Sequence, residues 1–154
     1  MEPFRVVDIA EIEPSGPGGA VRFVRRALDA RAFGINQLDL PAGFSGPQHD
    51  EAESAQEEVY VVLAGSGTIA LDGEQVELWP GRYVRVAPSV ARQLTAGPDG
   101  LTIVAIGAPL GGGYQPRGPF SRSPGGSLSR RAEPRTARPS RLSPRRGTRH
   151  RAAP

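Results

Sequence analysis

The sequence predicts an all-β domain, an antiparallel β-barrel or jelly-roll sandwich, over about residues 1–110. Short apolar or alternating stretches recur about every ten residues, and Gly, Pro and Asp-Gly turn signals separate them, as in sandwiches and barrels. The one helical candidate, residues 21–28, is short and weak. No internal repeat or heptad pattern is present, so a coiled coil is excluded.

The first two strand candidates differ in quality. Residues 5–12 alternate only loosely between apolar and polar side chains, whereas residues 32–40 alternate clearly. The second pattern defines two opposite faces of a strand without showing which one is inward. The two sets are Phe33, Ile35, Gln37 and Asp39 on one face, and Asn36, Leu38 and Leu40 on the other.

The middle of the domain carries the strongest strand signal. Residues 59–64 form a continuous apolar run rich in β-branched side chains, which predicts a strand buried on both faces. We expect Gly65-Ser66-Gly67 to be a hairpin turn that leads into a returning strand, residues 68–71. Asp72-Gly73 predicts a two-residue hairpin. The remaining predicted strands are residues 75–78, 83–86 and 101–106.

Composition divides the chain into two parts. Residues 1–116 hold eight arginines and fifteen acidic residues, a net charge of −7, whereas residues 117–154 hold eleven arginines and one acidic residue, a net charge of +10. The second part is mostly Arg, Pro, Ser, Gly, Ala and Thr, and such a stretch cannot bury enough apolar surface to fold. We therefore expect a β domain, residues 1–110, followed by a disordered basic tail, residues 111–154.

Three interpretations of the tail are open. Its arginines would attract nucleic acid or other polyanions without sequence preference. In a second interpretation the tail is passive, or it is the product of a GC-rich gene read past its proper end or in a shifted frame. In a third, it folds back loosely on the acidic domain. The abrupt reversal of charge favours the second, so we expect a nucleic-acid partner only if the tail binds it.

Several classes of protein are excluded. The chain has no cysteine, which excludes disulfides, thiolate nucleophiles and cysteine-ligated zinc. The N-terminal residues show no basic start followed by an apolar run, so we expect no signal peptide. No apolar run approaches the roughly 18 residues that a membrane span needs. We therefore expect a cytoplasmic protein with no membrane partner.

Two stretches have the residue spacing of a single bipartite site. In the first, Gly43 stands six residues before His49, and Glu58 stands seven residues before Gly65. The second stretch begins at Pro80-Gly81 and ends at residue 92. The two stretches resemble the two motifs of the cupin superfamily, over about residues 30–108. The resemblance implies a small β-barrel of the double-stranded jelly-roll type.

In metal-binding cupins, three histidines and one glutamate hold the ion. Carried over by position, the resemblance implies His49, Glu51 and Glu58, with Arg92 in place of the last histidine. The gap between the two glutamates is longer than in the family, so Glu53 could take the place of Glu51. Arginine has no lone pair and its charge repels a divalent ion, but it can hold either carboxylate through two hydrogen bonds.

Two interpretations of this site are open. In the first, Arg92 forms an internal salt bridge within a degenerate site that has lost its metal. In the second, His49, Glu51 and Glu58 bind Mn²⁺, Fe²⁺, Zn²⁺ or Ni²⁺, and Arg92 turns aside or binds an anionic substrate. In the absence of a metal, His49 beside Glu51 could act as a general base.

The leading functional hypothesis is a cupin-like protein that binds a small organic ligand, anionic if Arg92 contacts it, at the mouth of the barrel. Glu58 would orient Arg92, Tyr60 and Val62 would shape the wall, and Asn36 is a further pocket candidate. The alternative is a metal-dependent enzyme of the isomerase, dioxygenase or cyclase type. The family commonly dimerises, so the resemblance also implies a homodimer. The residues do not name a substrate, because this fold supports many functions.

Overall fold

The computed structural model describes residues 2–111 of the 154-residue chain. Two short 3₁₀ turns, Ile9–Glu11 and Pro17–Gly19, precede the other elements. The remaining elements follow in chain order as β1 (Val21–Arg22), α1 (Val24–Leu28), β2 (Gly34–Leu40), β3 (Gln56–Leu71), β4 (Glu74–Leu78), β5 (Tyr83–Val86) and β6 (Arg92–Pro109).

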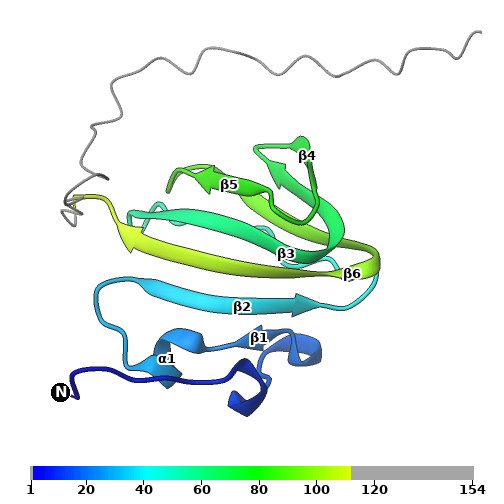
Figure 1. Ribbon diagram of the computed structural model, residues 1–154. Helices are drawn as coiled ribbons and strands as arrows, with labels where there is room; N and C mark the ends of the chain where they lie inside the picture. The colour runs from blue at the N-terminus through cyan, green and yellow to red at the C-terminus, as the bar shows by residue number, and fades with distance from the viewer. Residues whose placement is uncertain (1, 112–154) are drawn as a thin grey trace, which may run out of the picture. The chain divides into compact units, whose positions relative to one another are not determined.

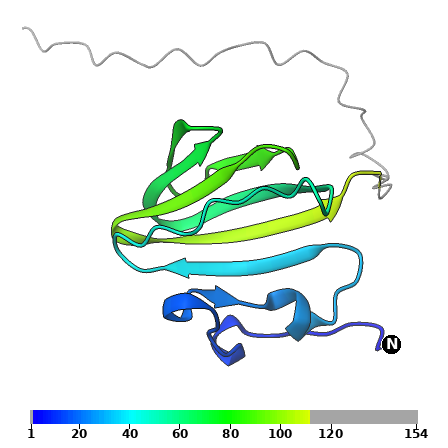
Figure 2. The same ribbon diagram turned by 180° about the vertical axis from the view of Figure 1, so that it is seen from behind.

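The strands form an antiparallel sheet that bends into two layers. The sheet has the order β1-β2-β6-β3-β4, and β5 pairs with β3 beside this path. The long strands β3 and β6 pair with each other from end to end. The first half of β3 also pairs with β5 and its second half with β4, so each half belongs to a different layer (Figures 1 and 2). The prediction of an all-β jelly-roll barrel is confirmed.

The chain between β2 and β3 completes the second layer. Ser45 pairs with Thr95, and His49 pairs with Arg92, through isolated antiparallel bridges to β6. Figure 2 shows this connection crossing the sheet on the side away from the viewer of Figure 1. It therefore brings the first sequence motif against the first residue of β6.

The predicted turn at Gly65-Ser66-Gly67 is wrong, because β3 continues through it. The pairing of β3 with β6 shifts register on both sides of this segment, and such bulges bend a strand without ending it. A Cβ atom on Gly65, whose φ is +75°, would lie 2.1 Å from the carbonyl oxygen of Gly100. Glycine is therefore needed at this crossing for close approach of two backbones.

The predicted two-residue hairpin at Asp72-Gly73 is confirmed. It joins β3 to β4, and Leu71 pairs with Glu74 across it. The φ angles of the two turn residues are both positive, 50° and 88°, as hairpin turns of this length require.

The N-terminal residues differ from their prediction. Residues 5–12 form no strand; Asp8 instead accepts a hydrogen bond from the amide of Ala10 and starts the first 3₁₀ turn. The weak helical candidate, residues 21–28, divides into the two-residue strand β1 and the five-residue helix α1. A loose alternation lacks the apolar face that would hold a strand in the sheet, so local capping decides this segment.

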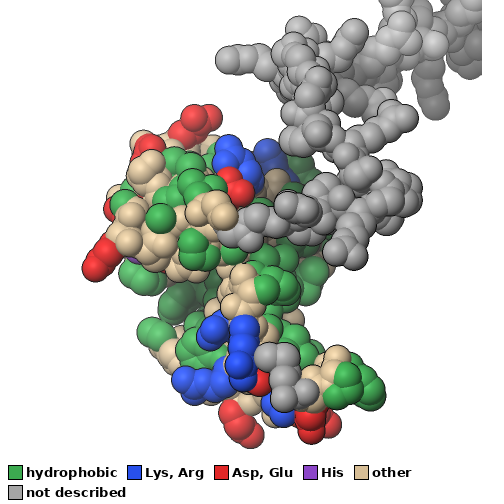
Figure 3. Space-filling view, turned by 90° about the vertical axis from the view of Figure 1, so that its left-hand side faces the viewer, with side chains coloured by type: hydrophobic (Ala, Val, Ile, Leu, Met, Phe, Trp, Pro, Cys, Tyr) green, Lys and Arg blue, Asp and Glu red, His purple; other side chains and the backbone are tan. Residues whose placement is uncertain are grey.

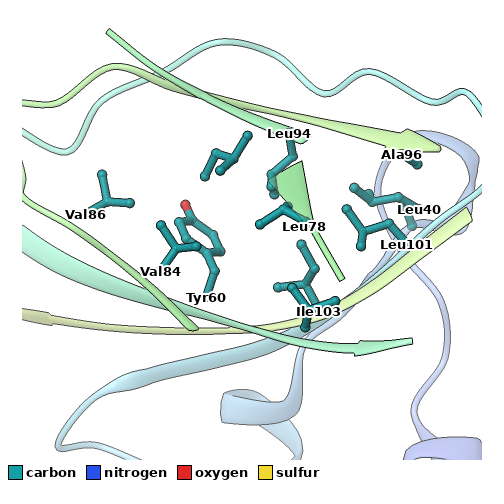
Figure 4. Packing of buried hydrophobic residues seen from close by; sticks show 12 residues of the cluster. Leu40, Tyr60, Leu78, Val84, Val86, Leu94, Ala96, Leu101 and Ile103 are labelled. Atoms are coloured by element: carbon teal, nitrogen blue, oxygen red, sulfur yellow. The ribbon is translucent and has the colours of Figure 1, made fainter. Parts of the chain in front are cut away.

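The hydrophobic core lies between the two layers, and Figure 4 shows its side chains meeting there. Leu38 and Leu40 point into it, so the face of β2 that carries Asn36 is the inner one. The other set of alternating residues, from Phe33 to Asp39, is therefore on the outer face. The buried hydrophobic residues are Ala20, Leu40, Tyr60, Val62, Ile69, Leu78, Val84, Val86, Leu94, Ala96, Leu101 and Ile103.

The strand predicted to be buried on both faces is buried on one. Tyr60 and Val62 are 2% and 1% exposed, whereas Leu63 on the outer side is 49% exposed. Within residues 2–111, no helix has the length and apolar character to cross a membrane. The predicted disordered tail lies outside the described residues except for Gly111, as does His150.

Candidate functional site at the barrel mouth

The mouth of the barrel lies where β3 begins and β6 ends. Glu58 is on the inner face of β3, because Tyr60 and Val62 follow it at intervals of two and are buried in the core. Its neighbours across the sheet are Val86 on β5 and Gly107 on β6. Figure 3 faces this end of the strands, where acidic and basic side chains lie beside one another among hydrophobic ones.

A pair of backbone hydrogen bonds places His49 at the mouth. The amide of His49 donates to the carbonyl of Arg92 at 3.1 Å, and the amide of Arg92 donates to the carbonyl of His49 at 2.8 Å. Residues directly opposite in an antiparallel pair carry their side chains on the same side. Since Arg92 points inward, His49 lies on the inward side as well, at the exposed rim.

The structure shows which of Glu51 and Glu53 places its carboxylate at the mouth. The amide of Glu51 donates to the carbonyl of Pro88 at 2.8 Å, and its carboxylate accepts hydrogen bonds from the Ser54 hydroxyl and, at 3.2 Å, from the Gln56 amide. Glu53 is exposed in the loop that follows. Glu51 is therefore the carboxylate held at the mouth.

Three potential ligand atoms, one each from His49, Glu51 and Glu58, lie within 4.8 Å of one another. His49 is exposed and the two glutamates are half-buried. These are the three residues that the family resemblance implied. They converge although eight residues of chain lie between His49 and Glu58.

Arg92 is the one buried charged residue in the described part of the chain, with a side chain that is 0% exposed. Its Nε and Nη2 atoms donate to the same oxygen of Glu58, Oε2, at 3.2 and 3.0 Å. Its Nη1 donates to the carbonyls of Val90 at 2.9 Å and Pro88 at 3.3 Å. The internal salt bridge considered from the sequence is therefore present.

The two hydrogen bonds that Arg92 makes to Glu58 both end on one oxygen. The arginine contacts one carboxylate oxygen rather than two, and no residue among 2–111 donates a hydrogen bond to the other oxygen, Oε1 of Glu58. The sequence suggested that Arg92 holds an anionic ligand. In the structure its bonded donors face Glu58 and two backbone carbonyls, inside the protein.

Tyr60 completes the contacts of Glu58. Its hydroxyl donates to Oε2 at 2.5 Å. Burial raises the pKa of Tyr60 well above its ordinary value, the adjacent Glu58 raises it further, and Arg92 lowers it in part. Desolvation lowers the pKa of Arg92, but the contacts with Tyr60 and Glu58 outweigh it and raise that pKa overall. The phenol therefore stays protonated and the guanidinium charged at neutral pH.

The other two predicted pocket residues lie deeper on the inner face. Val62 is 1% exposed and packs in the core, so it does not line the open mouth. Asn36 lies in register with Ala105 on β6, which in turn pairs with Tyr60 on β3. The Oδ1 atom of Asn36 is buried without a hydrogen-bond partner among the described residues. A buried amide oxygen of this kind marks a place for a donor group.

The residues at the mouth fit a divalent transition metal ion. One imidazole and two carboxylates are ligands that Mn²⁺, Fe²⁺ and Zn²⁺ accept. With a neutral histidine, the charges of the two carboxylates and Arg92 leave a net −1, which attracts a cation. Ligand atoms about 2.1 Å from such an ion lie roughly 3–4 Å apart. The three atoms here lie within 4.8 Å of one another, so binding an ion would draw them closer together.

Two surface hollows occur away from the mouth. One, of about 330 Å³, is lined by Phe23, Arg26 and the chain from Ile12 to Ser15. The other, of about 190 Å³, lies between residues 2–5 and the end of α1. Neither hollow is lined by any of the residues predicted from the two motifs, so neither coincides with the predicted site.

Comparisons with protein-family models and with curated proteins gave no match. Among solved structures, a cupin protein from Bacteroides fragilis is 28% identical, with a TM-score of 0.62 over 74% of this chain and 92% of that one. A protein from Thermotoga maritima, described as a predicted oxalate decarboxylase, is 19% identical, with a TM-score of 0.59 over 69% of this chain and 100% of that one. The jelly roll, the two motifs that meet at its mouth and these similarities show that the chain belongs to the cupin superfamily.

Proposed function

We propose that this protein binds a small organic molecule at the barrel mouth through a divalent transition metal ion held by His49, Glu51 and Glu58. The observation that carries the proposal is the convergence of three ligand atoms within 4.8 Å at the open end of the barrel. A bound ion would act as a Lewis acid on an oxygen atom of the ligand.

Within this proposal, Arg92 has a structural and an electrostatic role. It fixes Oε2 of Glu58 from inside the barrel, so that Oε1 is the oxygen left for an ion. Its charge also offsets one carboxylate. Because three neutral histidines and one glutamate also sum to −1, the changes of one histidine to Glu51 and another to Arg92 leave the charge of the site unchanged.

The same contacts support a metal-free alternative. Oε2 of Glu58 accepts three hydrogen bonds, and Glu51 is held by Ser54 and Gln56, so both carboxylates are stabilised without an ion. In this alternative the mouth binds its ligand directly, and His49, the exposed member of the group, contacts it. The two proposals differ in whether an ion binds.

The test is metal binding by the full chain. Elemental mass spectrometry and calorimetric titration with Mn²⁺, Fe²⁺, Zn²⁺ and Ni²⁺ would be compared for the native chain and for His49→Ala. Glu53→Gln is the matched control for an acidic residue outside the group, and His150→Ala is the control for an imidazole outside it. We expect about one ion per chain, lost in His49→Ala and retained in both controls.

Two outcomes would contradict the proposal. If the native chain binds no ion at any loading, the metal-free alternative replaces it. If His150→Ala loses the ion and His49→Ala keeps it, binding occurs outside the mouth. In either case, histidine resonances followed by NMR during addition of small carboxylic acids and sugars would then test for direct ligand contact at His49.

A further inference from the structure

The larger of the two surface hollows, which we call the N-terminal hollow, has a volume of about 330 Å³. One of its walls is the chain from Ile12 to Ser15, and the other is Phe23 with the first turn of α1. Figure 1 shows these segments beside β2, at the edge of the sheet that β1 forms. None of the residues at the barrel mouth lines this hollow, so it is a candidate binding site of its own.

Backbone and side-chain contacts hold the first wall in place. The amide of Ser15 donates to the carbonyl of Val21 at 2.8 Å, and the amide of Val21 donates to the carbonyl of Ser15 at 2.9 Å. Arg22 donates from Nη1 to the carbonyl of Ile12 and from Nε to Asp39 on β2, at 2.9 Å. The second wall, α1, packs against β2. Because both walls are attached to the sheet, the hollow exists before a ligand arrives, which lowers the ordering cost of binding.

Most of the hollow is apolar. Its apolar lining residues are Ile12, Pro14, Phe23 and Ala27. Phe23 is 39% exposed, so a ligand that covers its ring removes apolar surface from water. The volume is at the lower end of the range of about 300–1,000 Å³ found for ligand pockets. The hollow therefore suits a small molecule with one apolar group.

Two opposite charges, one on each wall, also line the hollow. They are Glu13 and Arg26, and both are exposed. Within residues 2–111, neither forms a salt bridge, whereas Arg5, Arg22 and Arg31 in the same part of the chain each pair with a carboxylate. Both charges of the hollow are therefore available to a ligand.

The contact between Arg26 and Phe23 orients the guanidinium at the hollow. Its Cζ lies 5.5 Å from the centroid of the ring. An arginine over an aromatic ring makes this contact with the flat face of its guanidinium. The N–H groups lie in the plane of the guanidinium and can form two parallel hydrogen bonds to a carboxylate. The cation and the apolar wall are thus adjacent, while Glu13 offers an acceptor for an ammonium group from the other wall.

We propose that the N-terminal hollow binds a free α-amino acid with an apolar side chain. The carboxylate of this ligand pairs with Arg26, its ammonium group pairs with Glu13, and its side chain covers Phe23. A ligand with a carboxylate alone would leave Glu13 without a partner, and an amine alone would leave Arg26 without one. A zwitterion with an apolar group is therefore the class of ligand that matches the hollow, and the proposal does not depend on binding at the mouth.

The test is titration of the full chain with four matched compounds, followed by ligand-observed NMR. L-phenylalanine carries an ammonium group, a carboxylate and an apolar side chain. The compound 3-phenylpropionate lacks the ammonium group, 2-phenylethylamine lacks the carboxylate, and glycine lacks the side chain. We expect L-phenylalanine to bind at least about tenfold more tightly than each of the other three.

Two variants assign the charges of the ligand to the two walls. Glu13→Gln and Arg26→Gln should each weaken binding of L-phenylalanine about tenfold, because each removes a hydrogen bond between charged groups. Glu13→Gln should also stop distinguishing L-phenylalanine from 3-phenylpropionate, and Arg26→Gln should stop distinguishing it from 2-phenylethylamine. Both positions are exposed, so the variants should fold, which circular dichroism would verify.

Glu11→Gln and Arg25→Gln are the matched controls. They make the same changes of charge at exposed positions that do not line the hollow, so they should bind as the native chain does. An amino acid can also coordinate a metal ion, so His49→Ala separates the hollow from the mouth and should retain binding. The proposal is overturned if L-phenylalanine does not bind, if 3-phenylpropionate or 2-phenylethylamine binds as tightly, or if the controls weaken binding as much as the hollow variants do. Loss of binding in His49→Ala would also overturn it, by placing the ligand at the mouth.

Discussion

Two adjacent glutamates on β3 each form an ion pair with an arginine, and the two pairs lie on opposite faces of the sheet. Glu57 points outward to Arg85, with an N–O distance of 2.6 Å and side chains 34% and 64% exposed. Glu58 points inward to Arg92, with a distance of 3.0 Å and side chains 18% and 0% exposed. The outer pair is shorter, but the inner pair is the one removed from water.

This difference shows that distance does not rank the two interactions. Water screens the outer pair and competes for its hydrogen bonds, so such pairs contribute about 0–1 kcal/mol. In the inner pair, the guanidinium of Arg92 has lost its hydration and depends on Glu58 and two backbone carbonyls, while Glu58 is only partly exposed. The outer pair should therefore contribute little to stability, whereas removing one partner of the inner pair should destabilise the protein strongly.

The largest expected effect is that of Arg92→Met, which keeps the apolar stem and removes the charge. The variant leaves Glu58 and the carbonyls of Pro88 and Val90 without their donor. Breaking a buried pair in this way lowers the free energy of unfolding by about 3–5 kcal/mol. Chemical denaturation measures this loss of unfolding free energy, and Arg85→Met is the matched control. Equal losses of stability in the two variants would contradict the distinction between the buried and the exposed ion pair.

A smaller effect is expected from Glu58→Gln. The amide still accepts hydrogen bonds from Tyr60 and Arg92, but the buried guanidinium loses its counter-charge, so we expect a loss of about 2 kcal/mol. Metal binding at the mouth should fall together with stability. Glu57→Gln, the adjacent control on the outer face, should change neither; a loss of metal in this control would place the ion elsewhere.

Tyr60→Phe should cost less still, about 1.5 kcal/mol for one hydrogen bond to a charged acceptor. As a neighbour that orients a ligand residue, Tyr60 should also affect metal affinity, by about tenfold. Calorimetric titration and denaturation at pH 7 measure the two effects. An unchanged metal affinity would limit Tyr60 to a structural role.

The raised pKa of Tyr60 also predicts a dependence on alkaline pH. Its folded pKa lies above the unfolded value of about 10, so the stability linked to this shift is complete below about pH 10 and is lost as the pH rises further. Unfolding measured between about pH 9 and 11 should show this additional loss in the native chain and not in Tyr60→Phe. If the native chain instead lost stability relative to Tyr60→Phe as the pH fell, the direction of the pKa shift would be wrong.

The smallest expected effect is that of Arg85→Ala. Its 64% exposed side chain should contribute no more than about 0.5 kcal/mol to the stability of the single chain. Thermal unfolding at low and high salt measures it. A loss comparable with that of Arg92→Met would show that the outer pair is also removed from water.

Features that depend on neighbouring residues could be predicted from the sequence alone. The alternation of residues 32–40 defined the two faces of β2, because the side-chain period of a strand is a local property. Asp72-Gly73 predicted the hairpin between β3 and β4, because the positive φ that such a turn needs is also local. The family resemblance carried by the two motifs implied the jelly-roll barrel and the three residues that meet at its mouth. The excess of arginine after residue 116 predicts a boundary between the domain and the tail.

Features that depend on contacts between distant residues became clear only in the folded chain. Gly65-Ser66-Gly67 has the composition of a turn, but β3 continues through it because it pairs with β6 on both sides. Glu51 and Glu53 are equivalent by spacing, and the backbone contact with Pro88 selects Glu51. Among residues 2–111, the carboxylate partner of Arg92 is Glu58, which lies 34 residues earlier in the chain. Such pairings follow from sheet register, and register is set by the packing of the whole core rather than by any local pattern.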